Sequence, residues 1–180
     1  YIDYNLLRED GKLYHNCLLD CVESLIPNAF ASVHAADLLE LPNGDLLCAW
    51  FAGSDEGNAD ISIAVSRLPA GASQWENARI VSDDTERSEQ NPSLFLTPAG
   101  EVWLMYTAQV SRPLEGNQQF NLQYTAEIRR KISKDLGYSW GETEVMFEHP
   151  GSFCRQKIQK LSNGRWKQKW KRYYSSTDFR

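Results

Sequence analysis

The chain has 180 residues, of which 42% are hydrophobic and 24% are charged, and its formal net charge is −5. This composition is that of an ordinary globular protein, and it excludes a disordered tail, a collagen-like fibre and a coiled coil. No apolar run approaches the roughly 18 residues that a membrane-spanning helix needs, so we expect no membrane partner.

The charge is distributed unevenly along the chain. Residues 1–150 hold 10 Lys and Arg against 23 Asp and Glu, a net charge of −13. Residues 151–180 hold 9 basic residues and one acid, a net charge of +8. An acidic body does not suit nucleic acid, so none is expected as a partner. The four cysteines complete no zinc pattern, and we expect neither a metal nor another cofactor.

Short strands separated by turns are predicted from residue 35 onwards. In the first round, Pro42-Asn43-Gly44 predicts a tight hairpin, because Asn-Gly supplies the positive φ that such a turn requires. Ile61, Ile63 and Val65 alternate with small residues, which is typical of a strand. The strands of this round are expected at residues 35–41, 45–51, 61–66 and 78–81.

The same layout recurs twice along the chain. The second round predicts strands at residues 92–96, 102–106, 122–132 and 144–147. The third predicts a strand at 153–161, a turn at 162–164 and a further strand from 165. The turn glycines Gly44, Gly100 and Gly164 recur at about 60 residues, and an aromatic residue follows each by six positions. Such a repeat indicates the blades of an all-β propeller, with a β-sandwich as the alternative.

One motif in the second round points to a family. Residues 133–140 read Ser-Lys-Asp-Leu-Gly-Tyr-Ser-Trp, which matches the Asp-box pattern S-x-D-x-G-x-[ST]-W. Its Asp can accept backbone N–H bonds within the turn, and its Trp can pack between blades. Residues 66–75 form a degenerate copy with Leu68 at the Asp position. The sequence therefore resembles the Asp-box (BNR-repeat) sialidase- or neuraminidase-like propellers, over roughly residues 32–166.

This resemblance implies four-stranded antiparallel blades around a central sugar-binding site. The chain would supply an incomplete ring of about two and a half to three blades. We expect an N-terminal segment at 1–33, which could belong to a ring-closing blade, and blades at 34–84 and 85–150, the second carrying the Asp-box. Residues 151–180 would start a third blade with a divergent basic tail.

The basic tail departs from the repeat. Lys167, Lys169 and Lys171 align with mostly apolar positions of the earlier rounds, and buried lysine is strongly disfavoured. One hypothesis is a truncated gene product, and a rival is a native basic arm. A homo-oligomer that completes the ring is a third expectation.

The starts of the first strands should meet at the axis of a propeller. Counting back ten and nine residues from the turn glycines gives His34, Gln90, Asn91 and Arg155, with Gln156 adjacent to the last. We expect Gln90, Asn91, Arg155 and Gln156 to bind substrate. The alternatives are a strand-start turn at Asn91 and a surface charge at Arg155.

Proton transfer is assigned to His34 and to three acids, Asp55, Glu56 and Asp60, in the loop that should open on the same face. A structural histidine and solvated loop acids are the alternative interpretations.

The function that the resemblance implies is an exo-glycosidase acting on a terminal acidic sugar. The Arg-Ile-Pro motif of strict sialidases is absent, and His34-Ala35-Ala36 stands in its place. Alternatives are a uronate-releasing polysaccharide lyase on the same propeller and a non-catalytic sugar-binding or assembly fragment. The compartment is left open, with extracellular and periplasmic sites both compatible, because no signal peptide is visible in the sequence.

Overall fold

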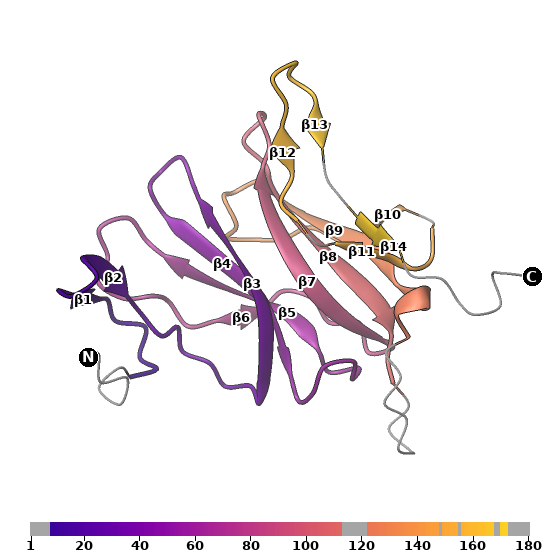
Figure 1. Ribbon diagram of the computed structural model, residues 1–180, viewed down its shortest axis with the longest axis horizontal. Coiled ribbons are helices and arrows are strands. Elements are labelled where there is room, and N and C mark those ends of the chain that lie inside the picture. The colour runs from indigo at the N-terminus through magenta and orange to yellow at the C-terminus, as the bar shows by residue number, and fades with distance from the viewer. Residues whose placement is uncertain (1–7, 113–121, 148, 155, 168–169, 173–180) are drawn as a thin grey trace, which may run out of the picture.

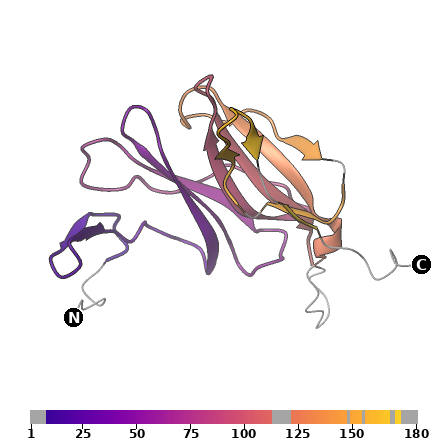
Figure 2. The same cartoon turned by 45° about the horizontal axis from the view of Figure 1, so that its top comes forward.

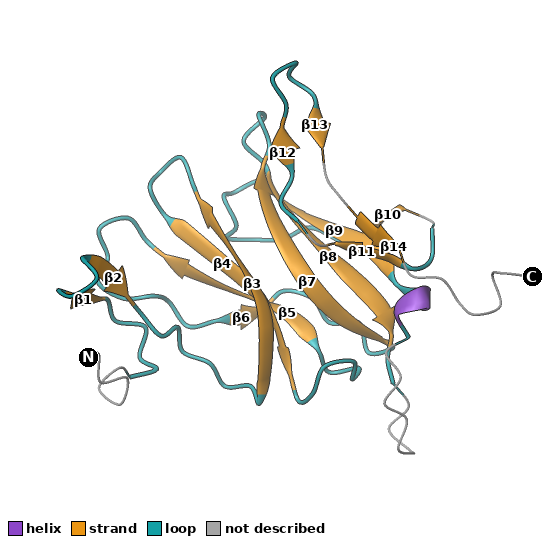
Figure 3. Ribbon diagram, in the orientation of Figure 1, coloured by secondary structure: helices purple, strands orange, loops and turns teal. Residues whose placement is uncertain are grey.

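Two four-stranded antiparallel sheets stand side by side, and shorter strand pairs flank them (Figures 1 and 3). The computed structural model describes residues 8–112, 122–147, 149–154, 156–167 and 170–172. Within these residues no helix is long and apolar enough to cross a membrane. The all-β architecture and the successive sheets confirm the prediction of an incomplete propeller.

The first blade follows the predicted layout. Its hairpin turns at Gly44, which has a φ of +84° and donates its N–H to the Leu41 carbonyl at 2.9 Å. Each strand pairs with the next along the chain, so the first strand is one edge of the sheet, and this inner edge contacts the first strand of the second blade. The strands are β3 (Ser32–Glu40), β4 (Leu46–Gly53), β5 (Ser62–Leu68) and β6 (Arg79–Ile80).

The second blade repeats this order with one correction. The expected strand at 122–132 instead begins as a short 3₁₀ turn, η2 (Gln123–Thr125), and the strand starts at Glu127. The Thr125 hydroxyl donates to the Leu122 carbonyl at 2.6 Å and accepts the Val110 N–H at 2.9 Å. These local bonds compete with a strand ladder. The strands are β7 (Arg87–Leu96), β8 (Val102–Val110), β9 (Glu127–Ser133) and β10 (Glu144–Phe147).

The third unit consists of two short strand pairs, so the continuous strand expected at 153–161 was wrong. β11 (Ser152–Cys154) pairs with β14 (Trp170–Arg172), and β12 (Gln159–Lys160) pairs with β13 (Trp166–Lys167). Between β11 and β12 the chain leaves the ladder, and the Lys157 ammonium bonds to the first blade.

The N-terminal segment adds a hairpin of β1 (Tyr14–Asn16) and β2 (Cys21–Glu23) beside the first blade (Figure 1).

The main core lies between the two complete blades. Leu47, Phe51 and Ile63 of the first blade pack in one buried cluster with Leu104 and Tyr106 of the second. The Asp-box tryptophan, Trp140, packs against the same cluster, as the motif predicts. Burial of this continuous apolar surface holds the blades together.

The opposite face of the first blade carries a second cluster. Trp50 and Trp75 are its largest buried members, and the N-terminal segment covers part of it with Leu13, Ile26 and Phe30.

Both inner strands are bulged at the same repeat position. The pairing shifts between His34 and Asp37 in β3, and between Gln90 and Ser93 in β7. Ala35 and Asn91, each nine residues before a turn glycine, have φ values of +55° and +50°. Bulges re-aim side chains and are frequent beside binding sites. The two bulges therefore occupy equivalent places in the two blades, whose sheets stay side by side when the molecule is turned by 45° (Figure 2).

Candidate functional site

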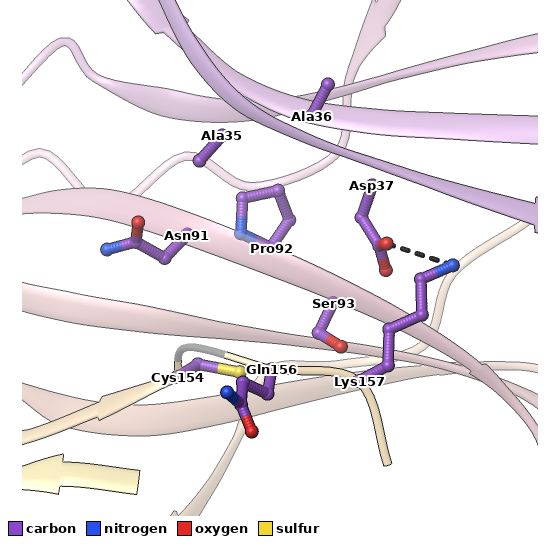
Figure 4. Close-up of a pocket in the computed structure, with 9 residues that line it drawn as sticks. All are labelled: Ala35, Ala36, Asp37, Asn91, Pro92, Ser93, Cys154, Gln156 and Lys157. Atoms are coloured by element: carbon purple, nitrogen blue, oxygen red, sulfur yellow. Dashed lines mark ion pairs between the residues drawn. The ribbon is translucent and has the colours of Figure 1, made fainter. Parts of the chain in front are cut away.

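A cavity of about 300 Å³ opens where the three units meet (Figure 4). Equivalent positions of three successive repeats line it, seven to ten residues before each turn glycine. This cavity, called the hub cavity below, has the size of a small-molecule site. Its lining residues are Ala35, Ala36, Asp37, Asn91, Pro92, Ser93, Cys154, Gln156 and Lys157.

Asp37 ties the three units together at the hub. Its Oδ2 accepts the Leu94 N–H from the second blade at 2.8 Å. Its Oδ1 lies 3.1 Å from Nζ of Lys157 in the third unit, and the same ammonium donates to the Leu38 carbonyl. The Asp37 side chain is 13% exposed and that of Lys157 is 53% exposed. The pair thus places a fixed carboxylate and a half-exposed cation on one cavity wall.

Ser93 carries an unpaired hydroxyl at the same wall. The residue is 4% exposed, and its Oγ has no hydrogen-bond partner within the described residues. Buried polar atoms are nearly always satisfied by protein, water or ligand. Ser93 lines the hub cavity, but its Oγ is itself buried, so the hydroxyl can reach a bound molecule only by rotating toward the cavity.

Two of the four predicted substrate-binding residues line the hub cavity. Asn91 and Gln156 both line the hub cavity. Gln90 does not, because it is 2% exposed and donates its side-chain amide to the Ser88 hydroxyl at 2.9 Å. Arg155 lies outside the described residues, so its assignment stays a prediction.

His34 lies at the exposed start of β3, opposite Phe51, on which its ring stacks at a centroid distance of 5.3 Å. It lines a neighbouring cavity, which shares Ala35 and Ala36 with the hub cavity.

The three predicted loop acids follow β4, at the end of the first blade where β3 begins. Asp60 accepts the Ser54 N–H at 2.9 Å and the Ser54 hydroxyl at 2.8 Å, which closes the loop on itself. Arg112, from the second blade, lies 2.7 Å from Asp55 and also donates to the Glu56 carbonyl. This guanidinium lowers the pKa of Asp55, whose side chain is 70% exposed. None of the three acids lines the hub cavity.

A buried ionic cluster lies away from the hub cavity, within the second blade and the segment that leads into it. Arg129 is 2.6 Å from Asp84, 2.8 Å from Glu127 and 3.6 Å from Glu89, which is only 1% exposed. Burial raises the pKa of Glu89, and burial likewise raises the pKa of Tyr106. These groups pair with one another, so the cluster ties the segment around Asp84 to the second blade.

Three cavity residues escaped sequence reasoning: Asp37, Ser93 and Lys157. Each stands seven positions before its turn glycine, and in the two complete blades this is the point where the bulge ends. The counting that gave Asn91 would have found them if extended by two residues. Among the described residues, no group of three or more His, Cys, Asp and Glu could hold a metal ion.

The family and structure comparisons agree on one fold. A family model described as a BNR repeat-like domain matches residues 44–168. A search of curated proteins gave no match. Among solved structures, the Hadza microbial sialidase Hz136 is 15% identical with a TM-score of 0.57, covering 75% of this chain and 31% of that chain.

Two further structures give the same result. A protein of unknown function from Dyadobacter fermentans is 16% identical with a TM-score of 0.56, covering 74% of this chain and 45% of its own. Trypanosoma rangeli sialidase, solved with sialic acid, is 12% identical with a TM-score of 0.51, covering 88% of this chain and 29% of its own. At these identities the likeness shows the fold, and the match spans less than half the length of each protein.

Proposed function

This chain belongs to the BNR repeat-like family of sialidase-like propellers, and from that premise we propose that it acts as an exo-glycosidase on a terminal acidic sugar. The hub cavity would hold that sugar. The observation that carries the proposal is a cavity that equivalent positions of three repeats build, with the Asp37 carboxylate and the Lys157 ammonium in its wall.

The cavity wall suits a sugar with a carboxylate. Lys157 offers a half-exposed ammonium that can bind the carboxylate, while Asp37 holds its Nζ in place at 3.1 Å. Asn91, Gln156 and the Ser93 hydroxyl supply neutral groups that can bond to sugar hydroxyls. Arg155 is proposed as a second cation beside them, on its sequence position alone.

Hydrolysis requires one group that protonates the leaving glycosidic oxygen and one carboxylate that assists attack at the anomeric carbon. Asp55 is proposed as the carboxylate, because Arg112 favours its ionised form. This role requires the 54–60 loop to move toward the hub cavity, which Asp55 does not line. His34 and Glu56 are proposed for proton donation. Asp60, whose oxygens are engaged by Ser54, would position this loop.

Ser93→Ala gives the sharpest test of the sugar site. Because the hydroxyl is unpaired, its removal should leave the urea midpoint of the free protein unchanged or slightly raised. The affinity for sialic acid or glucuronate, measured by calorimetry on the full chain, should fall about tenfold if the hydroxyl bonds to the sugar. Unchanged affinity would remove Ser93 from the site.

The acidic-sugar assignment is tested by Lys157→Gln, with Lys160→Gln as the matched control outside the cavity. We expect Lys157→Gln to weaken binding of acidic sugars at least tenfold and of neutral sugars little. Release of the aryl group from aryl sialosides and uronosides, before and after His34→Ala, tests catalysis. Sugar binding without turnover of any glycoside would favour a non-catalytic binding module, and no sugar binding would overturn the proposal.

A further inference from the structure

A second cavity, of about 340 Å³, adjoins the hub cavity on the other side of β3. Its lining is mainly apolar, and its apolar members are Ile26, Val33, Ala35, Ala36, Cys48 and Trp50. Trp50 is 6% exposed and Cys48 is 8% exposed, so these two packed side chains of the first blade form a rigid floor for the cavity. Burial in these apolar surroundings also raises the pKa of the Cys48 thiol to about 11. We call this space the apolar cavity.

The N-terminal segment completes the apolar cavity. Ile26 packs against the cluster around Trp50 and also lines the cavity. Asn28, its neighbour in the wall, satisfies its own amide locally, since Nδ2 donates to the Phe30 carbonyl at 2.9 Å and Oδ1 accepts the Phe30 N–H at 3.2 Å. Both polar atoms of the Asn28 side chain therefore bond to the N-terminal segment itself. This part of the cavity wall offers few hydrogen-bonding groups to a ligand.

The two cavities share Ala35 and Ala36, the residues of the β3 bulge. Neither shared residue carries a side chain longer than a methyl group, so no long side chain separates the two cavities at this bulge. His34 stands beside it and lines the apolar cavity. Its ring stacks on Phe51 and makes no hydrogen bond to another described residue. A polar ring thus stands at the junction of a polar cavity and an apolar one.

We propose that the apolar cavity binds the aglycone of the substrate, and that this aglycone is an aryl or alkyl group. The inference rests on the proposed function, because the sugar would occupy the hub cavity while its substituent passes Ala35 and Ala36. The glycosidic oxygen would then lie near His34. An apolar floor with an aromatic member favours a flat apolar group over a second sugar, whose hydroxyls would find few partners here.

The test uses Val33→Asp in the full chain, with Leu38→Asp as its control. Val33 lines the cavity and is 41% exposed, whereas Leu38 lies on the same strand outside the cavity and is 47% exposed. Because both side chains are more than one-third exposed, we expect the two substitutions to change the free energy of unfolding by similar small amounts. The probe is 4-methylumbelliferone alone, measured by equilibrium dialysis. We expect Val33→Asp to weaken its binding at least tenfold and Leu38→Asp to change it less than twofold.

A second measurement compares aryl and methyl glycosides of the same acidic sugar. Val33→Asp should weaken the aryl glycoside at least tenfold and leave the methyl glycoside and the free sugar unchanged. If the free sugar binds but 4-methylumbelliferone does not, or if both variants weaken it equally, the aglycone inference is overturned while the proposed function stands. If 4-methylumbelliferone binds and no sugar does, both the proposed function and the aglycone assignment fall.

Discussion

The two complete blades differ in how they stabilise the turn between their third and fourth strands. In the second blade the carboxylate is local: Asp135 accepts the Ser133 hydroxyl at 2.7 Å and the Ser139 N–H at 2.8 Å. In the first blade Leu68 occupies that position, and the carboxylate comes from Asp45, more than 20 residues earlier, which accepts the Ala70 N–H at 2.8 Å. The turn needs an acceptor for its N–H groups, and either source can supply it.

The two carboxylates also differ in which parts of the molecule they connect. Asp45 is 4% exposed and pairs with Arg67, which is 3% exposed. Arg67 donates in addition to the Leu136 carbonyl, inside the Asp-box turn of the next blade, and lies 3.9 Å from the centroid of the Tyr138 ring. Within the part of the chain that the structure describes, the Asp135 carboxylate bonds only to Ser133 and Ser139 of its own turn. The remote carboxylate therefore couples two blades, whereas the local one stabilises a single turn.

The largest expected effect comes from Asp45→Ala. This change leaves the Arg67 guanidinium buried without its carboxylate partner and removes the acceptor of Ala70. Breaking a buried ion pair from one side costs about 3–5 kcal/mol. Urea unfolding followed by tryptophan fluorescence measures the loss. A loss no greater than that of Asp135→Asn would contradict the difference between the two turns.

Gly137→Ala ranks second. Gly137 has a φ of +88°, and an added Cβ would lie 2.7 Å from Cδ1 of Leu47, a fully buried residue of the first blade. Left-handed strain and overpacking together should cost about 3 kcal/mol in the free energy of unfolding. Gly71→Ala is the control in the other turn. Its φ is +75°, but nothing lies within 4 Å of the added Cβ, so strain alone should cost about 1 kcal/mol. Equal midpoints for the two variants would show that the Asp-box turn does not pack closely on Leu47.

Much of this architecture could be predicted from local signals. The turn glycines and the Asp-box tryptophan predicted the strand order and the packing between blades, because both depend on short-range geometry. The bulge at Ala35 could not be predicted, since alanine gives no sign of a left-handed φ, whereas asparagine at position 91 is a residue type that tolerates one.

Two further features could not be predicted from the sequence. They are the Asp37–Lys157 ion pair and the role of Asp45, which supplies the carboxylate that the degenerate Asp-box of the first blade lacks. Each joins residues far apart in the chain, and sequence alone does not reveal such a contact. The candidate site was therefore half predicted: Asn91 and Gln156 line the hub cavity, but its ion pair and its unpaired hydroxyl came from the structure.

Asp135→Asn should have a smaller effect than either change. It removes the charge that accepts the Ser133 and Ser139 hydroxyls, and one charge-assisted bond at an exposed site contributes about 1 kcal/mol. Ser139→Ala should reproduce most of this loss, since the Ser139 hydroxyl is one of the two donors. Differential scanning calorimetry of the two variants and their double mutant measures the coupling. Additive losses would show that Asp135 and Ser139 do not act through the same bond.

The smallest effect is the pH dependence of the stability difference between wild type and Asp135→Asn. This dependence tests whether the charge of Asp135 causes the difference. The hydrogen bond from the Ser139 hydroxyl, with help from its N–H, lowers the pKa of Asp135 from its ordinary 3.8 to about 2. A carboxyl whose pKa is lowered by folding stabilises the native state above its unfolded pKa, and that stability disappears as the pH falls through the folded pKa. The urea midpoints of wild type and Asp135→Asn should therefore differ by a constant amount from pH 7 to pH 5 and converge as the pH approaches 2. Asp45, whose pKa is lowered chiefly by the Ala70 N–H, loses its contribution in the same direction, but in both proteins, so it cancels from the comparison. A gap that persists at pH 2 would mean that the shape of the carboxyl group, and not its charge, stabilises the turn.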